Sequence, residues 1–223
     1  MPDQELFFDS FVQPAVRGYL HRPENPNGDG MILSHGAGSN AQAPLLSTLA
    51  EEFSAAGFAV LRCDLPYRQV RPQGPPGPGD AARDRAGLKN AIAAMRKLAT
   101  GWIFLGGHSY GGRQSTMLCA EDPKLADGLL LLSYPLHPPR KPEQLRIQHF
   151  PNLRNPSLFV HGTRDPFASD EEIEKALKLI PAKTKLLTVE GAGHELNFKK
   201  GKPGGELVDE VVSAFQEFFA ERL

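Results

Sequence analysis

The sequence predicts an α/β protein, with a mostly parallel β-sheet covered by helices on both faces. Short apolar runs alternate with segments of helical periodicity, which is the order of repeated strand–helix–strand units. From residue 30 on, the apolar runs are nearly continuous, as in strands covered on both faces. No linker divides the 223 residues into two hydrophobic cores, so we expect one domain over residues 1–223.

Eight apolar runs are expected to form the strands. The first two are separated by only about two residues, which predicts an antiparallel hairpin. The later runs are joined by helical segments, which predicts right-handed crossovers and parallel pairing. The eight runs lie near residues 5–12, 15–20, 30–34, 58–63, 102–106, 128–133, 157–161 and 184–190.

Helical periodicity predicts helices between these strands. Gly57 follows the first helix as a C-terminal stop, and Asp80 precedes the second as a candidate cap. Ser169, with Glu172 three residues later, forms a capping-box pattern before the third. The segment after Ser109 is also expected to be helical. The other predicted helices are 41–56, 80–99, 170–180 and about 205–221.

Composition excludes several classes of protein. The chain has 25 Lys and Arg against 26 Asp and Glu, and this net charge of -1 argues against broad electrostatic capture of nucleic acid or anionic membrane. No run approaches the ~18 apolar residues of a membrane helix. The first five residues lack the basic region of a secretory signal. We therefore expect a soluble, cytoplasmic protein.

No cofactor or metal is expected. Cys63 and Cys119 lie in no CxxC or zinc-ligand pattern and are expected to be small buried side chains. The histidines are scattered, and no HExxH-type cluster is present. The oligomeric state cannot be read from the sequence.

One motif points to nucleophilic catalysis. Residues 102–112 read Trp-Ile-Phe-Leu-Gly-Gly-His-Ser-Tyr-Gly-Gly and contain a GxSxG pattern centred on Ser109. An apolar strand precedes it and a helix follows, as a nucleophile elbow requires. Glycine at 107 and 111 removes side chains that would collide with neighbours in so tight a turn. The turn would hold the Ser109 hydroxyl above the sheet edge, at the positive end of the following helix.

A serine hydroxyl is a weak nucleophile at neutral pH and needs a general base. Among seven histidines, His194 is the best candidate, because it follows the last predicted strand in the segment Gly191-Ala192-Gly193-His194-Glu195. A loop there can bring the imidazole over the sheet edge to Ser109. The alternatives are His21, His35, His108, His137, His149 and His161.

The base in turn needs a carboxylate that orients it and stabilises the imidazolium. Asp165 comes just after the 157–161 strand, at the same predicted edge of the sheet. Asp64, just past the 58–63 strand, is the remaining competitor, with anchoring of the following loop as its other role.

An oxyanion hole is predicted upstream. Residues 34–39 read Ser-His-Gly-Ala-Gly-Ser and follow a predicted strand, and their small side chains let backbone N–H groups approach a tetrahedral oxygen. We assign the donors as the amides of Ala37 and of Tyr110, the residue after the nucleophile. A phosphate-binding loop is disfavoured, because the GxxxxGK[ST] lysine and the GxGxxG spacing are missing.

The order Ser109, Asp165, His194, with the oxyanion segment upstream, resembles an α/β-hydrolase over nearly the whole chain. The resemblance implies an eight-stranded sheet with an antiparallel second strand. Three segments resemble a small, lidless, dienelactone-hydrolase-like group, which includes relatives of the third subunit of the NSL histone-acetyltransferase complex. Dienelactone hydrolases proper have a cysteine nucleophile, whereas this chain has a serine. The three segments are Asp64–Arg68, Ser133–Pro139 and His161–Phe167.

The expected site is open and shallow. Two proline-rich stretches, 71–80 and 135–142, follow predicted strand ends, where they would be either surface loops or the rim of a ligand site. We expect them to border this site. Only about 23 residues separate the 128–133 and 157–161 strands, too few for a cap domain. The residues expected to bind substrate are Gly36, Tyr67, Arg68, Arg113 and Tyr134, and among the arginines Arg113 is the best candidate to bind an anionic group.

The predicted function is therefore that of a serine hydrolase, acting on a small-molecule ester, thioester or activated amide through an acyl-enzyme. Two alternatives stay open. A hydrolase scaffold can serve as a non-catalytic interaction module, because fold does not confer activity. The same three residues could also carry out acyl transfer or perhydrolysis, since the sequence does not reveal the acyl acceptor.

Overall fold

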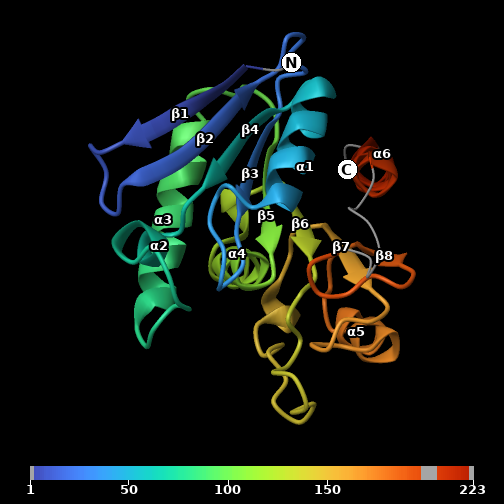
Figure 1. Cartoon of the computed structure of the whole chain (residues 1–223). Helices are drawn as coiled ribbons and strands as arrows, with labels where there is room; N and C mark the ends of the chain where they lie inside the picture. Colours follow the sequence, from blue (N-terminus) through green and yellow to red (C-terminus); the bar gives the residue numbers. More distant parts are fainter. Residues whose placement is uncertain (1–2, 197–204, 221–223) are drawn as a thin grey trace.

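The computed structural model describes residues 3–196 and 205–220. Its centre is an eight-stranded sheet in the order β1-β2-β4-β3-β5-β6-β7-β8 (Figure 1). β2 is antiparallel to β1 and β4, and all other pairs are parallel, which confirms the predicted sheet. The strands are β1 Asp3–Asp9, β2 Val16–Arg22, β3 Gly30–Ser34, β4 Ala59–Cys63, β5 Ile103–His108, β6 Gly128–Leu132, β7 Ser157–Gly162 and β8 Thr184–Val189.

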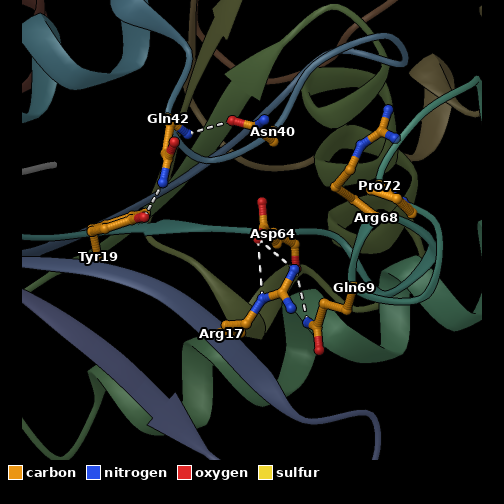
Figure 2. Close-up of a pocket in the computed structure, with 8 residues that line it drawn as sticks. All are labelled: Arg17, Tyr19, Asn40, Gln42, Asp64, Arg68, Gln69 and Pro72. Atoms are coloured by element: carbon orange, nitrogen blue, oxygen red, sulfur yellow. Dashed lines mark hydrogen bonds and ion pairs between the residues drawn. The ribbon is translucent and has the colours of Figure 1, made fainter.

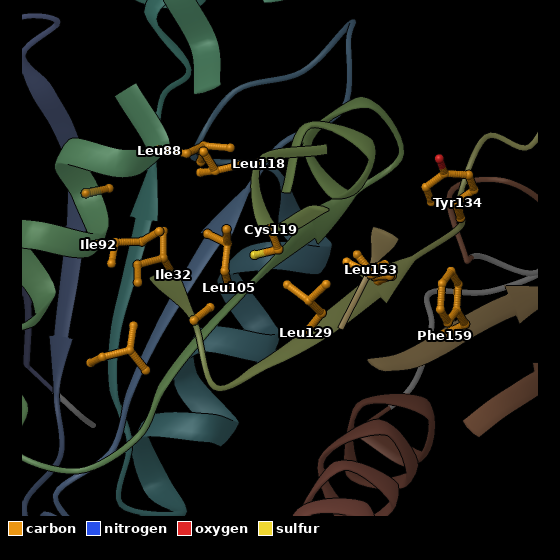
Figure 3. Packing of buried hydrophobic residues seen from close by; sticks show 14 of the residues in the cluster. Ile32, Leu88, Ile92, Leu105, Leu118, Cys119, Leu129, Tyr134, Leu153 and Phe159 are labelled. Atoms are coloured by element: carbon orange, nitrogen blue, oxygen red, sulfur yellow. The ribbon is translucent and has the colours of Figure 1, made fainter. Parts of the chain in front are cut away.

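Helices cover both faces of this sheet, as predicted. One apolar cluster joins α1 to α6 through residues such as Leu49 and Phe215. The other joins α3, α4 and α5 through Leu88, Leu118 and Ile173, and Figure 3 shows part of it. Because each sheet face is buried, the strands carry apolar residues on both sides. The helices are α1 Pro44–Ala55, α2 Pro66–Val70, α3 Asp80–Met95, α4 Tyr110–Glu121, α5 Asp170–Leu177 and α6 Gly205–Ala220.

Local signals for helix ends were informative. Gly57 has φ +98° directly after α1, a conformation that glycine adopts without a steric penalty. The capping box of α5 is present: the Ser169 hydroxyl accepts from the Glu172 amide at 3.3 Å, and the Glu172 carboxylate accepts from the Ser169 amide at 2.8 Å.

Several predicted boundaries were wrong. The hairpin connection between β1 and β2 spans residues 10–15 rather than about two residues. α3 ends at Met95 instead of 99, because the next residues tighten into turns and the Thr100 and Gly101 amides donate to the Gly28 carbonyl. The short helix α2 was not predicted. The predicted end of the last helix at residue 221 lies outside the described residues.

The expected capping role of Asp80 was also wrong. Gly79, at φ +89°, is the residue that caps α3, and Asp80 is already its first helical residue. The Asp80 carboxylate accepts from the Gly77 amide at 2.6 Å and pairs with Arg71. Asp80 therefore fixes the proline-rich loop that leads into the helix.

The described connection between β6 and β7 contains no separate cap. The only regular element there is a three-residue 3₁₀ helix, Phe150–Asn152, so the predicted absence of a lid domain holds for this connection. Within the described ranges, no helix has both the length and the apolar character needed to cross a bilayer.

Candidate active site

Ser109 forms the turn between β5 and α4 by itself. β5 ends at His108 and α4 begins at Tyr110, and Ser109 between them has φ 50° and ψ -112°. Such a conformation is strained for a residue with a side chain and persists only where the surroundings enforce it. The Ser109 amide donates to the Leu132 carbonyl of β6 at 2.8 Å, which holds the turn against the sheet. The hydroxyl thus lies at the N-terminus of α4.

The two glycines of the GxSxG pattern are required by β3. A Cβ on Gly107 would lie 2.3 Å from the Ser34 carbonyl oxygen, and a Cβ on Gly111 would lie 2.5 Å from the Ser34 Oγ. Side-chain atoms do not approach so closely, so any larger residue would push the elbow away from β3. The spacing therefore reflects the packing of the turn against Ser34.

The loop after β8 carries His194. Gly191, with φ +74°, turns the chain, and its amide donates to the Thr163 hydroxyl at 2.8 Å. The Arg164 amide donates to the Ala192 carbonyl at 2.9 Å. A Cβ on Gly162 would lie only 2.5 Å from the Ala192 carbonyl oxygen. The two loops that follow β7 and β8 are therefore packed directly against each other.

Asp165 lies in the first of these loops. Its side chain is fully buried, its amide donates to the Gly162 carbonyl at 2.9 Å, and its Oδ1 accepts from the Phe167 amide at 2.9 Å. One carboxylate oxygen is thus used to shape the turn, and Oδ2 is left to face the neighbouring loop.

The structure brings Ser109, His194 and Asp165 together. His194 Nδ1 lies 2.8 Å from Asp165 Oδ2, and His194 Nε2 lies 2.8 Å from Ser109 Oγ. A buried carboxylate accepts only, so Nδ1 carries the proton and Nε2 accepts from the serine hydroxyl. The Phe167 ring stacks on the imidazole, with centroids 4.1 Å apart, which further fixes its orientation.

A second histidine supports the first. His108 Nε2 lies 2.8 Å from the carbonyl oxygen of His194 and donates to it. Burial lowers the pKa of His108, which keeps its ring neutral. This bond ties the loop that carries His194 to the elbow. The role of His108 was not predicted from the sequence.

The segment after β3 passes directly beside Ser109. A Cβ on Gly36 would lie 3.6 Å from the Ser109 Cβ and 2.9 Å from His108 Nδ1, so only glycine leaves room here. Within the described residues, neither the Ala37 amide nor the Tyr110 amide donates to another group of the protein. Two N–H groups without a partner among the described residues therefore flank the serine.

Side chains below this segment hold it in place. The Tyr67 hydroxyl donates to the Ala37 carbonyl at 2.8 Å, and Arg68 donates to the carbonyls of Ser39 at 2.7 Å and Ala37 at 3.2 Å. Both side chains come from α2 and are buried. Burial raises the pKa of Tyr67 to about 12, so its hydroxyl stays a donor at neutral pH.

Asp84 links the two flanking segments. This α3 residue is fully buried, and its carboxylate accepts from the Tyr67 amide at 3.0 Å and from the Tyr110 hydroxyl at 2.7 Å. Tyr67 supports Ala37, and Tyr110 supplies the other free amide. The buried Asp84 carboxyl group therefore holds the two residues that position the amides beside Ser109. Burial raises the pKa of Asp84.

His35 completes this support. Its Nδ1 donates to the Gly36 carbonyl at 2.8 Å and its Nε2 accepts from the Leu65 amide at 3.1 Å. Burial lowers the pKa of His35 to about 4, so the ring is neutral at physiological pH and keeps this donor and acceptor pattern.

Of the five residues expected to bind substrate, only Gly36 is among the described residues that line the cavity at Ser109. Gly36 lines the cavity at Ser109, whereas Tyr67 and Arg68 lie beneath the Ala37 segment and hold its backbone. Tyr134 is buried: its hydroxyl donates to the Arg146 carbonyl at 2.8 Å and its ring packs on Phe150 and Phe159. Arg113 has a buried Nε and faces Tyr134 and Arg146.

A cavity of about 420 Å³ opens over Ser109. Its described lining comes from the segment after β3, the elbow, and the loops after β7 and β8. Neither proline-rich stretch contributes to that lining, so the expected rim of prolines is not formed here. The lining residues are Gly36, Ala37, Gly38, Ser39, His108, Ser109, Phe167, His194 and Glu195.

Asp64, the competing acid, belongs to a separate polar cavity of about 240 Å³ (Figure 2). Its Oδ1 accepts from the Ala41 amide at 2.8 Å, and its Oδ2 pairs with Arg17 at 2.9 Å. Gln69 donates to the Asp64 carbonyl at 2.9 Å. Asp64 therefore connects β2, the segment after β3 and α2, and it does not meet His194.

Both cysteines are free and buried. Burial raises the pKa of Cys63 and of Cys119 to about 12, so both thiols are protonated at neutral pH. Within residues 3–196 and 205–220, no group of three or more His, Cys, Asp or Glu side chains is arranged to hold a metal ion.

Solved structures with this fold include several hydrolases. A dienelactone hydrolase from Anabaena variabilis is 21% identical with a TM-score of 0.76, over 98% of this chain and 97% of that chain. Est1E from Butyrivibrio proteoclasticus is 17% identical with a TM-score of 0.73, over 97% and 99%. A serine hydrolase without a lid from Xanthomonas campestris is 14% identical with a TM-score of 0.71, over 99% and 95%.

These similarities confirm the predicted fold: an eight-stranded, mostly parallel sheet of the α/β-hydrolase type without a separate cap. A family model described as an alpha/beta hydrolase domain matches residues 28–220, a range that contains the elbow and the loops after β3, β7 and β8. Because this match covers most of the sequence, the chain belongs to the alpha/beta hydrolase domain family.

Proposed function

We propose that this protein is a serine hydrolase that cleaves small neutral acyl esters, with Ser109 as nucleophile, His194 as general base and Asp165 as its orienting acid. The observation that carries the proposal is the continuous hydrogen-bonded chain from Asp165 through His194 to Ser109, with 2.8 Å at each step. This chain ends inside an open cavity, beside two amides that have no partner in the described protein.

The first half-reaction forms the acyl-enzyme. His194 Nε2 takes the hydroxyl proton while Ser109 Oγ attacks the acyl carbon, and Asp165 stabilises the resulting imidazolium. The developing oxyanion accepts hydrogen bonds from the amides of Ala37 and Tyr110. In other enzymes, one such donor stabilises the transition state by about 2.7–4 kcal/mol. When the carbon–oxygen bond breaks, His194 gives its proton to the leaving alkoxide.

The second half-reaction regenerates the enzyme. Water enters the open cavity, His194 Nε2 removes one proton from it, and the hydroxide oxygen attacks the acyl carbon of the acyl-enzyme. The same two amides hold the second oxyanion. Collapse releases the carboxylic acid and returns the proton to Ser109. Thioesters and activated amides can follow the same path, since their leaving groups also accept a proton from His194.

The described lining of the cavity offers no cationic partner for the anionic group expected from the sequence. Glu195 is the charged residue among its described lining residues, and no lining residue there is Arg or Lys. Arg113, the arginine expected to bind an anion, faces Tyr134 and Arg146 instead. A carboxylate on the substrate would therefore meet Glu195 without a compensating cation from the described lining.

The same fold is compatible with two other functions. An interaction module, suggested by the resemblance to relatives of the third NSL subunit, has no need of a complete nucleophile–base–acid chain, and the geometry here supports an enzyme. Acyl transfer and perhydrolysis use the same chain and differ only in the acceptor, so the acceptor has to be measured.

The test is a panel of acetyl, butanoyl, hexanoyl and octanoyl esters of one chromogenic alcohol, with and without added alcohol, thiol or peroxide. We expect turnover of the shorter neutral esters and free acid as the main product. Product that partitions mainly to the added acceptor would identify a transferase or perhydrolase. Folded protein that turns over none of these esters would contradict the proposal.

The hydrogen bond from Tyr67 to the segment that carries the Ala37 amide leads to a prediction for kcat. Tyr67→Phe removes the donor to the Ala37 carbonyl and should lower kcat about two- to tenfold, since one hydrogen bond is worth roughly 0.5–1.5 kcal/mol. KM should stay nearly constant, because the oxyanion exists only in the transition state. The measurement is kcat and KM for a neutral ester.

Tyr134→Phe is the matched control for this variant. It also removes a buried tyrosine hydroxyl, but that hydroxyl donates to the Arg146 carbonyl and does not contact the Ala37 segment. Its kcat should remain close to that of the unchanged protein. Equal losses in both variants would show that the Tyr67 hydroxyl has no special role.

A further inference from the structure

A second cavity adjoins the one over Ser109. It has a volume of about 200 Å³ and is mainly apolar, and it lies between the start of α1 and the elbow. Ala43 and Leu45 are half-buried members of the adjoining apolar cluster, and Leu46 is fully buried in it. The lining residues are Gly36, Ser39, Ala43, Pro44, Leu45, Leu46, His108 and Glu195.

The two cavities share part of their walls. Gly36, Ser39, His108 and Glu195 line both of them. Gly36 stands between the two spaces and has no side chain; a Cβ there would lie 2.9 Å from His108 Nδ1 and 3.6 Å from the Ser109 Cβ. Gly36 therefore packs closely against the elbow, and the link between the two cavities is the wall that they share. A flexible chain attached to a carbon on Ser109 can reach the apolar space along this shared wall.

The chemistry of the Ser109 cavity decides which part of an ester can enter. The leaving oxygen must face His194 Nε2, which protonates it, and Phe167 stacks on that ring. Both His194 and Phe167 line the first cavity and neither lines the second. The leaving group therefore belongs on the side of Phe167, and the apolar cavity is free for the acyl side.

We propose that the apolar cavity beside α1 is the acyl-chain pocket, and that it selects uncharged, straight acyl groups of about four to six carbons; this rests on the serine hydrolase function proposed above. An apolar cavity of about 150 Å³ in another protein binds benzene, so a cavity of about 200 Å³ accommodates a chain of similar carbon number. Longer chains would exceed this space.

The rim of the pocket also selects acyl groups by their charge. Glu195 is exposed and lines both cavities, so its carboxylate lies along the path of the acyl chain. A chain that ends in a carboxylate would be repelled there, and the apolar wall of Ala43, Leu45 and Leu46 offers no partner for a charge. The pocket therefore disfavours acyl groups derived from dicarboxylic acids.

The test is the substitution Ala43→Leu, which places a larger side chain at the rim of the pocket. Ala43 has φ -51° and ψ 129°, which leucine adopts without strain, and it is only half-buried, so Ala43→Leu should fold. In the unchanged protein, kcat/KM should rise about fourfold per methylene from acetyl to butanoyl, and remain high to hexanoyl. In Ala43→Leu, kcat/KM for hexanoyl should fall at least tenfold, and that for acetyl should change less than threefold.

Glu52→Leu is the matched control, since it adds a leucine to an exposed position of the adjoining helix α1, outside the cavity. It should leave the acyl-length profile unchanged. An unchanged profile in Ala43→Leu overturns the assignment. So does a profile that shifts with the length of the alcohol instead of the acyl group, because the pocket would then hold the leaving group.

Binding separates failure of the pocket from failure of the proposed function. If no ester is turned over, the Ser109→Ala variant is titrated with methyl hexanoate and methyl acetate, and binding is followed by NMR. Preferential binding of the hexanoate that Ala43→Leu weakens at least tenfold supports the pocket without catalysis. Equal or undetectable binding of the two esters overturns the pocket.

Discussion

Replacing Ser109 by alanine is expected to lower kcat for neutral ester hydrolysis by about a million-fold, the loss seen when the nucleophile of another serine hydrolase is removed. The hydroxyl on His194 Nε2 is the atom that becomes acylated, and alanine offers no substitute. Water would then have to attack the ester directly, without an acyl-enzyme. Steady-state kinetics on a butanoyl ester measure this loss.

Ser133→Ala is the control for this substitution. Ser133 is also buried after a strand and also has a positive φ, 49°, but its Oγ has no partner within the described protein. Its removal should change kcat less than threefold. A Ser109→Ala protein that retains more than about one per cent of the rate, purified away from contaminating esterases, would contradict the role of Ser109.

Replacing Asp165 by asparagine should lower kcat by about ten-thousand-fold, as the equivalent change does in a well-studied serine protease. Asparagine can keep the bond to the Phe167 amide through its carbonyl oxygen. Its NH₂ group would then face His194 Nδ1, which favours the tautomer with the proton on Nε2. That tautomer cannot accept the Ser109 proton. The measurement is kcat, with circular dichroism to verify folding.

Asp64→Asn distinguishes between the two carboxylates that the sequence offered. Asp64 pairs with Arg17 and the Ala41 amide, so its variant should lose less than about tenfold through slight displacement of the segment after β3. The reverse outcome, with Asp64→Asn inactive and Asp165→Asn nearly unchanged, would overturn the assignment of the acid.

Much of the fold was predictable because its signals are local. Continuous apolar runs identified the parallel strands, and Gly57, Ser169 and Glu172 marked helix ends through their own backbone and side-chain chemistry. The proximity of Ser109 to the loops of Asp165 and His194 followed from one rule: the carboxyl ends of parallel strands share one edge.

The support beneath the site could not be predicted in the same way. Asp84 lies in a helix and meets Tyr67 and Tyr110 only through the packing of α2, α3 and α4, which the sequence pattern does not specify. A signal did exist, since Asp84 is a carboxylate that the helix buries completely. Buried carboxylates are rare without partners, so helix periodicity alone could have marked it.

The substrate-binding residues were the least predictable. Arg113 follows Ser109 by four residues, but nearness along a helix does not give the direction of a side chain. Arg113 lies near Tyr134 and Arg146 and is not among the described residues that line the Ser109 cavity. Tyr134 likewise follows a strand end, yet its ring fills a space among Phe150 and Phe159.

The most direct test of the central claim, that His194 and Asp165 activate Ser109, is covalent labelling by an alkyl fluorophosphonate followed by peptide mass mapping. We predict one phosphonyl group per chain, on the peptide that contains Ser109, and labelling slowed at least a thousand-fold in His194→Ala. Folded protein that remains unlabelled, that is labelled at another serine, or that labels equally fast without His194 would contradict the account.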